Sequence, residues 1–118
     1  MPTNEPDYRL MRRVALGEEE AVAELYDRFG PLVFKLSRQF LTNTADSEDA
    51  VQEIFVRLWK TADRFDPRKA KLVTWVMLIT RRHLIDRIRK NLFVQNNKNL
   101  ENITEKPQPM DLFHRRYG

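Results

Sequence analysis

Positively charged side chains gather in the middle of the sequence, and their types suit the binding of phosphate groups. Between Asp63 and Lys90 there are nine bases and three acids, a net charge of +6. Arginine binds phosphate through a planar fork of N–H donors and also stacks on nucleic-acid bases. The pattern favours a nucleic-acid surface, although a solvated outer face of a core helix would look similar. The basic candidates are Arg64, Arg68, Lys69, Lys71, Arg81, Arg82, Arg87, Arg89 and Lys90.

The segment just before these bases carries the opposite charge. Between Asp46 and Lys60, four acids and two bases give a net charge of −2. Acids in the first turn of a helix are favoured by the helix dipole, which could by itself explain Asp46 and Glu48. Gln52 has no such explanation, because it is uncharged. Two neighbouring segments of opposite sign indicate two different partners.

Catalytic chemistry finds little support in the sequence. His83 and Asp86 are three residues apart on one expected helix, a spacing that could serve a metal ion or a proton transfer. However, the chain has only two histidines, no cysteine and no glycine-rich phosphate loop. His83 lies beside several arginines and is better explained as a DNA-facing or surface residue. We therefore expect no enzymatic activity, no cofactor and no metal site.

Length and composition predict one soluble domain. The 118 residues are 42% hydrophobic and 32% charged, with a net charge of +4, which is a globular balance. The absence of cysteine fits a reducing compartment. The first residues, MPTNEPDYRL, are not a basic start followed by an apolar run, and no apolar stretch reaches about 18 residues. We expect a cytoplasmic protein that does not insert into a membrane.

The hydrophobic period is helical throughout, which predicts an all-α fold: a compact bundle of four to five helices with an irregular C-terminal tether. Asp7 could cap a first short helix, and Gly17 could close it in the left-handed conformation. A second helix begins with the acids of residues 18–20. At Pro31 we expect a new helix or a kink. The third clear helix spans residues 47–61.

The last helix, expected over residues 72–90, changes character along its length. Its first half has apolar residues on both sides and is expected to be buried nearly all round, whereas its second half keeps one apolar stripe. The first set is Leu72, Val73, Trp75, Val76, Met77, Leu78 and Ile79, and the second is Leu84, Ile85, Ile88 and Leu92. Phe65 and Trp75 could stack bases, but both are better explained as core. Asparagines and prolines after Lys90 predict a tether, so we expect a domain over 1–91 and a tail over 92–118.

Two ordered patterns resemble a known family. DSEDAVQEIFVRLWKTADRFDP and KLVTWVMLITRRHLIDRIRK resemble region two, the promoter-binding domain, of bacterial extracytoplasmic-function sigma factors. The first pattern is carried by Asp49, Ala50, Gln52, Glu53, Phe55 and Trp59. The second is carried by Thr74, Trp75, Ile85, Asp86, Arg87 and Arg89. The likeness covers roughly residues 7–91.

The resemblance implies a domain that attaches to core RNA polymerase and recognises and melts the minus-ten promoter element. The acidic helix would dock on the clamp helices of the largest polymerase subunit, with Asp49, Gln52 and Glu53 as polar contacts and Arg57 and Trp59 at the margin. The loop over residues 64–71 would capture an unstacked base of the non-template strand, which costs a few kcal/mol to extract. The last helix would follow the opened DNA through Arg81, Arg82, Arg87, Arg89 and Lys90.

The sequence departs from the family's pattern at two points. Many members carry asparagine where this chain has Arg82, and arginine favours guanine or phosphate, so no minus-ten sequence can be transferred. Members also continue into a second helix-turn-helix domain, whereas here only MDLFHRRYG follows the tether. We expect either a shortened form of a longer protein, which we favour, or a natural single-domain variant. An anti-sigma factor is an expected partner, and the free chain is expected to be a monomer.

A helical interaction adaptor is the main alternative to this function. Such a protein would use the acidic helix for a protein partner, and its basic face would be solvated only. Salt dependence separates the two functions, because nucleic-acid affinity falls linearly with the logarithm of salt concentration and hydrophobic docking does not.

Overall fold

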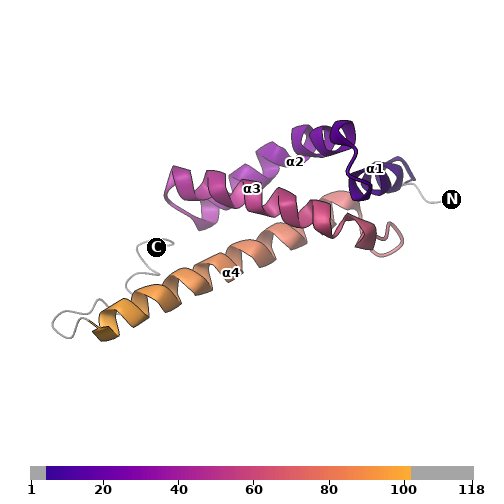
Figure 1. The fold of residues 1–118 in the computed structure, drawn as a ribbon. Helices are drawn as coiled ribbons and strands as arrows, with labels where there is room; N and C mark the ends of the chain where they lie inside the picture. The colour runs from indigo at the N-terminus through magenta and orange to yellow at the C-terminus, as the bar shows by residue number, and fades with distance from the viewer. Residues whose placement is uncertain (1–4, 102–118) are drawn as a thin grey trace.

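A computed structural model of the chain describes residues 5–101, and the side chains of residues 6–97. Every regular element in this range is helical, which confirms the predicted all-α bundle. The elements are α1 (Glu5–Ala15), α2 (Glu19–Phe40), α3 (Thr44–Lys60), the short 3-10 helix η1 (Ala62–Arg64) and α4 (Leu72–Glu101). Helices α2, α3 and α4 run alternately up and down beside one another, and α1 lies across one end (Figure 1).

The turn between α1 and α2 closes as the sequence predicts. Gly17 has φ 77°, and the Gly17 and Glu18 amides donate to the carbonyl oxygens of Val14 and Arg13 at 2.9 and 3.1 Å. This pair of bonds is the Schellman arrangement, which favours glycine at the left-handed position. The prediction that Asp7 caps α1 is wrong. α1 begins at Glu5, and the Asp7 carboxylate instead accepts a 2.6 Å hydrogen bond from Arg28 of α2.

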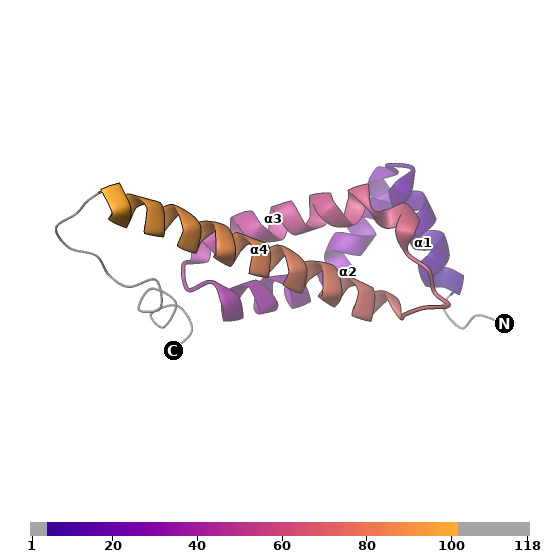
Figure 2. The same ribbon diagram turned by 90° about the horizontal axis from the view of Figure 1, so that it is seen from below.

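Pro31 lies inside α2 and does not end it. Proline lacks the N–H that would bond to the preceding turn, so it weakens the helix locally and bends its axis. Figure 2 shows α2 changing direction along its length. The predicted kink is therefore present, and the stretch after it belongs to the same helix.

α3 begins three residues earlier than the predicted Ser47, at Thr44. The Asn43 side chain accepts hydrogen bonds from the amides of Ala45 and Asp46 at 2.8 and 3.2 Å. Asparagine is among the best residues for this capping role, because it satisfies amides that have no partner within the helix. The cap fixes the start of the helix that carries the acidic residues.

α4 is buried along one side only, so the prediction that its first half is enclosed nearly all round is wrong. The buried side of α4 is a row of residues spaced by four, which packs into the core shared with α2 and α3. We call it the inner row, and it consists of Leu72, Val76, Thr80, Leu84 and Ile88. Val73 and Leu78, on other sides of the helix, are 39% and 45% exposed. Ile85, expected in the apolar stripe, is also 39% exposed. With α2 and α3 packed against one side of α4, the bundle has too few elements to cover the rest of that helix.

α4 also continues to Glu101, past the point at which we expected a tether to begin. Its sequence contains neither glycine nor proline, and the first proline beyond Lys71 is Pro107. Asparagines lower helix propensity without terminating a helix. The yellow end of α4 projects beyond α2 and α3 in both views (Figures 1 and 2). The remainder of the predicted tail, residues 102–118, lies outside the described residues.

Candidate functional site

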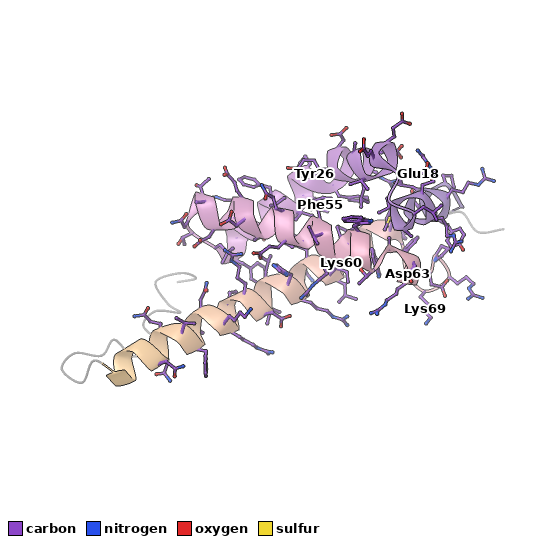
Figure 3. The ribbon with its side chains drawn as sticks, viewed as in Figure 1. Glu18, Tyr26, Phe55, Lys60, Asp63 and Lys69 are labelled. Atoms are coloured by element: carbon purple, nitrogen blue, oxygen red, sulfur yellow. The ribbon has the colours of Figure 1, made fainter. Side chains whose placement is uncertain are left out.

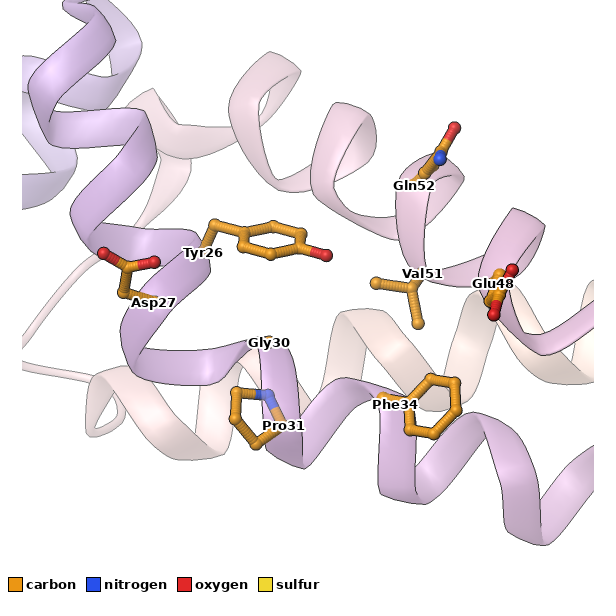
Figure 4. Close-up of a pocket in the computed structure, with 8 residues that line it drawn as sticks. All are labelled: Tyr26, Asp27, Gly30, Pro31, Phe34, Glu48, Val51 and Gln52. Carbon is orange, nitrogen blue, oxygen red and sulfur yellow. The ribbon is translucent and has the colours of Figure 1, made fainter. Parts of the chain in front are cut away.

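The outer face of α3 and the neighbouring face of α2 border an open groove of about 600 Å³. Eight residues line it: Tyr26, Asp27, Gly30, Pro31, Phe34, Glu48, Val51 and Gln52. Figure 4 shows the Tyr26 ring lying between the two helices, with its hydroxyl toward Val51. Tyr26 and Phe34 are 50% and 38% exposed. We call this feature the α2–α3 groove, and it combines an apolar floor with acidic edges.

A second hollow of about 560 Å³ continues the groove toward the α1–α2 turn. Tyr26 and Asp27 line both hollows, and Trp59 closes the far side of the second. The Trp59 ring lies over Gly17 and remains 47% exposed. An exposed aromatic row that joins two hollows is typical of a protein-binding surface.

The predicted polar contacts of α3 do not all face outward. Asp49 and Gln52 are exposed, as a docking role requires. Glu53 instead turns toward α4, where its Oε1 atom lies 2.8 Å from His83 Nε2 and 2.8 Å from Arg87 Nη1. Because the carboxylate is the acceptor, the proton of the imidazole must be on Nε2.

Other charged groups extend this contact between the two helices. Arg87 also lies 3.7 Å from Asp46, and Arg57 lies 3.7 Å from Asp86. We define the polar seam as the six residues that join α3 to α4: Asp46, Glu53, Arg57, His83, Asp86 and Arg87. Two members from α4 are largely enclosed, since the side chains of His83 and Arg87 are 14% and 19% exposed. The seam fixes α4 against α3.

The seam shifts the ionisation of Glu53. Partial burial by itself would raise the pKa of this carboxyl. The hydrogen bond from His83 and the charge and hydrogen bond of Arg87 outweigh that effect, so the pKa of Glu53 is lowered. A lowered pKa means that the charged carboxylate is the form that the folded protein stabilises.

The loop between α3 and α4 encloses a separate hollow of about 470 Å³, which we call the loop pocket. Its lining residues are Tyr8, Asp63, Arg64, Phe65, Asp66, Pro67 and Arg68. Asp63 and Lys69 project from this loop next to α1 in Figure 3. Asp66 accepts hydrogen bonds from the backbone and the guanidinium of Arg68 at 2.9–3.2 Å. The side-chain hydrogen bond from Arg68 is the main reason that the pKa of Asp66 is lowered.

The two aromatic residues considered for base stacking belong to the interior. Phe65 is 4% exposed, and its ring centroid lies 5.8 Å from that of Trp75. Trp75 is partly buried and packs against the core cluster. The alternative explanation offered by the sequence, that both are core residues, is therefore confirmed.

The predicted basic residues divide between the surface and the polar seam. All but one of them are exposed: Arg64, Arg68, Lys69, Lys71, Arg81, Arg82, Arg89 and Lys90. Arg87 is the exception, because it faces Glu53 and Asp46. We call Arg81, Arg82, Arg89 and Lys90, on the exposed side of α4, the basic face. The exposed apolar residues Leu78 and Ile85 lie on the same side of α4.

Sequence reasoning missed the contributions of α1 and α2. Tyr8, Tyr26 and Phe34 are distant in sequence from the segments of opposite charge, and nothing in their local pattern distinguishes them from core residues.

Among the described residues, no group of three or more histidine, aspartate or glutamate side chains could hold a metal ion. No helix in that part of the chain is both long and apolar enough to cross a membrane.

Comparison with known proteins finds a match to the sigma-70 region 2 family over residues 25–92. The ECF RNA polymerase sigma factor SigK of Mycobacterium tuberculosis (strain ATCC 25618 / H37Rv) is 36% identical over 80 residues, which are 68% of this chain and 43% of that protein. The SigK proteins of Mycobacterium ulcerans (strain Agy99) and Mycobacterium sp. (strain KMS) are 34% and 31% identical over 80 residues, again 68% of this chain and 43% and 42% of theirs. The chain thus aligns with less than half the length of the curated relatives it matches.

Proposed function

Because the chain belongs to the sigma-70 region 2 family, we propose that it is the domain of an extracytoplasmic-function sigma factor that binds core RNA polymerase and opens promoters. It would recognise and melt the minus-ten element and would act without catalysis. One observation supports this most directly: an apolar groove with acidic edges and a basic helix face are joined in one unit by the polar seam. Two different macromolecules can therefore be held in a fixed relation to each other.

The α2–α3 groove is the proposed contact for the polymerase clamp helices. Gln52 supplies a polar group at its edge, and Asp49 lies exposed nearby on α3. Tyr26 and Phe34 supply exposed apolar area, which Trp59 extends in the second hollow. A groove of this kind suits an amphipathic helix that carries basic residues beside its apolar side. The docking role that we expected for Glu53 and Arg57 becomes indirect in this proposal, since both take part in the seam.

The basic face of α4 is the proposed contact for the displaced non-template strand. Its residues, together with Lys69 and Lys71 near the start of α4, lie on exposed surface where phosphates can reach them. Cationic contacts along a strand supply most of the sequence-independent affinity for nucleic acid. Leu78 and Ile85 add apolar area on which sugars or bases can rest. Arg87 would act by positioning α4 rather than by touching DNA.

The loop pocket is the proposed receptor for one base extracted from the stack. Its volume falls within the range of small-molecule pockets, about 300–1,000 Å³. Arg64 stands at the pocket and could hold a flanking phosphate, whereas Arg68 is paired with Asp66. Extraction of a base costs a few kcal/mol, so the pocket and the basic face must act together.

The remaining partners follow from the same proposal. The protein would work in the cytoplasm, where the polymerase is, and would be a monomer when free. An anti-sigma factor that covers either surface would keep it inactive. The domain limits proposed from the sequence, 1–91 and 92–118, stay as the division between the promoter-binding part and a tail, although α4 runs across that limit.

Capture of core RNA polymerase tests the docking surface. Gln52→Ala should weaken capture of the core enzyme by immobilised protein about fivefold or more, because a polar contact of the proposed interface is lost. Gln39→Ala, which removes an exposed glutamine of α2 that does not line the groove, is the matched control and should bind as the parent does. Equal capture by both variants would reject the groove as the polymerase contact.

A further inference from the structure

The loop pocket has one aromatic wall that the sequence did not reveal. Tyr8 of α1 lines the pocket opposite the loop between α3 and α4 and is 40% exposed. Within the described part of the chain, its hydroxyl makes no hydrogen bond and its ring has no aromatic partner. Tyr8 is therefore available to a ligand. This inference rests on the proposed function, because it concerns the base that the pocket would receive.

Neither of the other nearby aromatic residues can serve as a stacking platform. Phe65 also lines the pocket, but it is 4% exposed and its ring packs toward Trp75. Trp75 does not line the pocket and is engaged with the core. Among the described residues that line the loop pocket, Tyr8 is therefore the one that offers an open ring face to a base.

The charges around the pocket favour a neutral flat group over a phosphate. Two acids and two bases line it, Asp63 and Asp66 against Arg64 and Arg68, so their formal charges cancel. Arg68 is further neutralised by its hydrogen bonds to Asp66. The surrounding segment, residues 63–90, carries a net charge of +6. The surrounding surface therefore attracts phosphates, and the pocket itself suits an uncharged ring such as a nucleic-acid base.

We infer that Tyr8 is the stacking residue that holds the extracted base in the loop pocket, so that α1 takes part in promoter opening. Stacking of a base on an aromatic side chain has little sequence preference, since every base has a π face. Tyr8 would therefore stabilise the open strand, and the choice of base would belong to the polar groups of the loop. The two walls of the pocket come from α1 and from the loop before α4, which are far apart in the sequence and packed against each other in the fold.

Fluorescence of a base analogue tests this role directly. The full chain is titrated into single-stranded 12-nucleotide DNAs that carry one central 2-aminopurine, whose emission falls when it stacks. Binding is followed in parallel by anisotropy of an end label. Tyr8→Leu should abolish the quenching and weaken binding about tenfold, within the range known for loss of one stacked base. Tyr8→Phe keeps the ring and should behave as the parent.

Two controls separate stacking from loss of structure. Leu16→Ala removes an exposed apolar side chain just after the end of α1, outside the proposed binding surfaces, and should leave quenching unchanged. In a 12-nucleotide DNA that is abasic at every position, Tyr8→Leu should bind as the parent does, because no base is present to stack. Circular dichroism confirms the helical content of each variant.

The possible failures are distinguishable. If the parent chain binds these DNAs and Tyr8→Leu shows the same quenching and affinity, the stacking role is wrong and the proposed function stands. If Tyr8→Leu weakens intact and abasic DNAs equally, Tyr8 supports the loop without stacking, and the inference is again overturned. If the parent chain binds no single-stranded DNA even at low salt, both the stacking role of Tyr8 and the DNA-binding part of the proposed function are wrong.

Discussion

Removal of the Glu53 carboxylate should destabilise the protein, whereas removal of its neighbour Gln52 should not. Glu53 accepts two 2.8 Å hydrogen bonds, one from His83 and one from Arg87, and so links α3 to α4. Gln52 is exposed on the outer side of α3. The family pattern places the two residues side by side, but the structure gives them opposite surroundings. Glu53→Ala and Gln52→Ala are therefore a matched pair.

The expected size of the effect follows from the exposure of the partners. Charge-assisted hydrogen bonds contribute about 1.5–3 kcal/mol each when enclosed, and exposed ion pairs contribute about 0.2–1 kcal/mol. The Glu53 side chain is 51% exposed, while its partners are 14% and 19% exposed. An intermediate loss of about 1–2 kcal/mol is expected, which lowers the Tm of a domain of this size by roughly 5–10 °C. For Gln52→Ala the change should stay within about 0.5 kcal/mol.

Thermal and urea unfolding, followed by circular dichroism, measure both variants. A double-mutant cycle with His83→Ala should give a coupling energy of about 0.5 kcal/mol or more, as expected for groups in direct contact. If Glu53→Ala and Gln52→Ala unfold at the same temperature, the seam does not stabilise the fold. Glu53 would then be better explained by the polymerase-docking role that the family resemblance implied.

Two further predictions concern pH and salt. The pKa of Glu53 is lowered in the folded protein. The stability that the Glu53 carboxylate contributes is therefore fully present above its unfolded-state pKa of about 4.3 and is lost as pH falls through the lower folded-state pKa. In urea titrations, the difference in unfolding free energy between the parent and Glu53→Gln should be constant near pH 7 and should shrink below about pH 4. For single-stranded DNA, the logarithm of the affinity falls with the logarithm of the salt concentration, and replacing both Arg89 and Lys90 with alanine should make this slope shallower by about 0.7 per lost phosphate contact. Arg12→Ala, which removes an exposed base of α1, is the control and should leave the slope unchanged. An affinity that does not depend on salt would favour the adaptor function instead.

The fold could be predicted from sequence wherever the cause is local. Gly17 and the helical period concern a few neighbouring residues, and both predictions are confirmed. Asp7 was assigned as a cap because its type suits that role, yet its actual partner, Arg28, comes from the next helix. The exposure of Val73 and Leu78 depends on how many helices surround α4, which no local pattern states. The errors therefore arise where tertiary contacts decide.

The family itself could be identified from the sequence, and the comparison confirms it. Residue roles within the site could be predicted less completely. The family resemblance assigned Glu53 to the polymerase contact and Arg87 to the DNA, whereas the structure pairs these two residues with each other. A sequence shows which residues are charged but not which of them neutralise each other. Tyr8 was missed for a related reason, since a pocket wall contributed by a distant helix leaves no trace in the spacing of the loop.

The polar seam has a mechanical consequence for promoter opening. The basic face of α4 lies on the part of the helix whose inner row is buried, so a force on DNA held there acts on the packing of α4 against α2 and α3. The apolar row of α4 resists separation from α2 and α3, but hydrophobic contact is non-directional and resists sliding weakly. Hydrogen bonds and ion pairs among Glu53, Arg57, His83, Asp86 and Arg87 add directional contacts between α3 and α4. In the proposed function, a strand bound to α4 would thus be held in fixed register with a polymerase bound to α3.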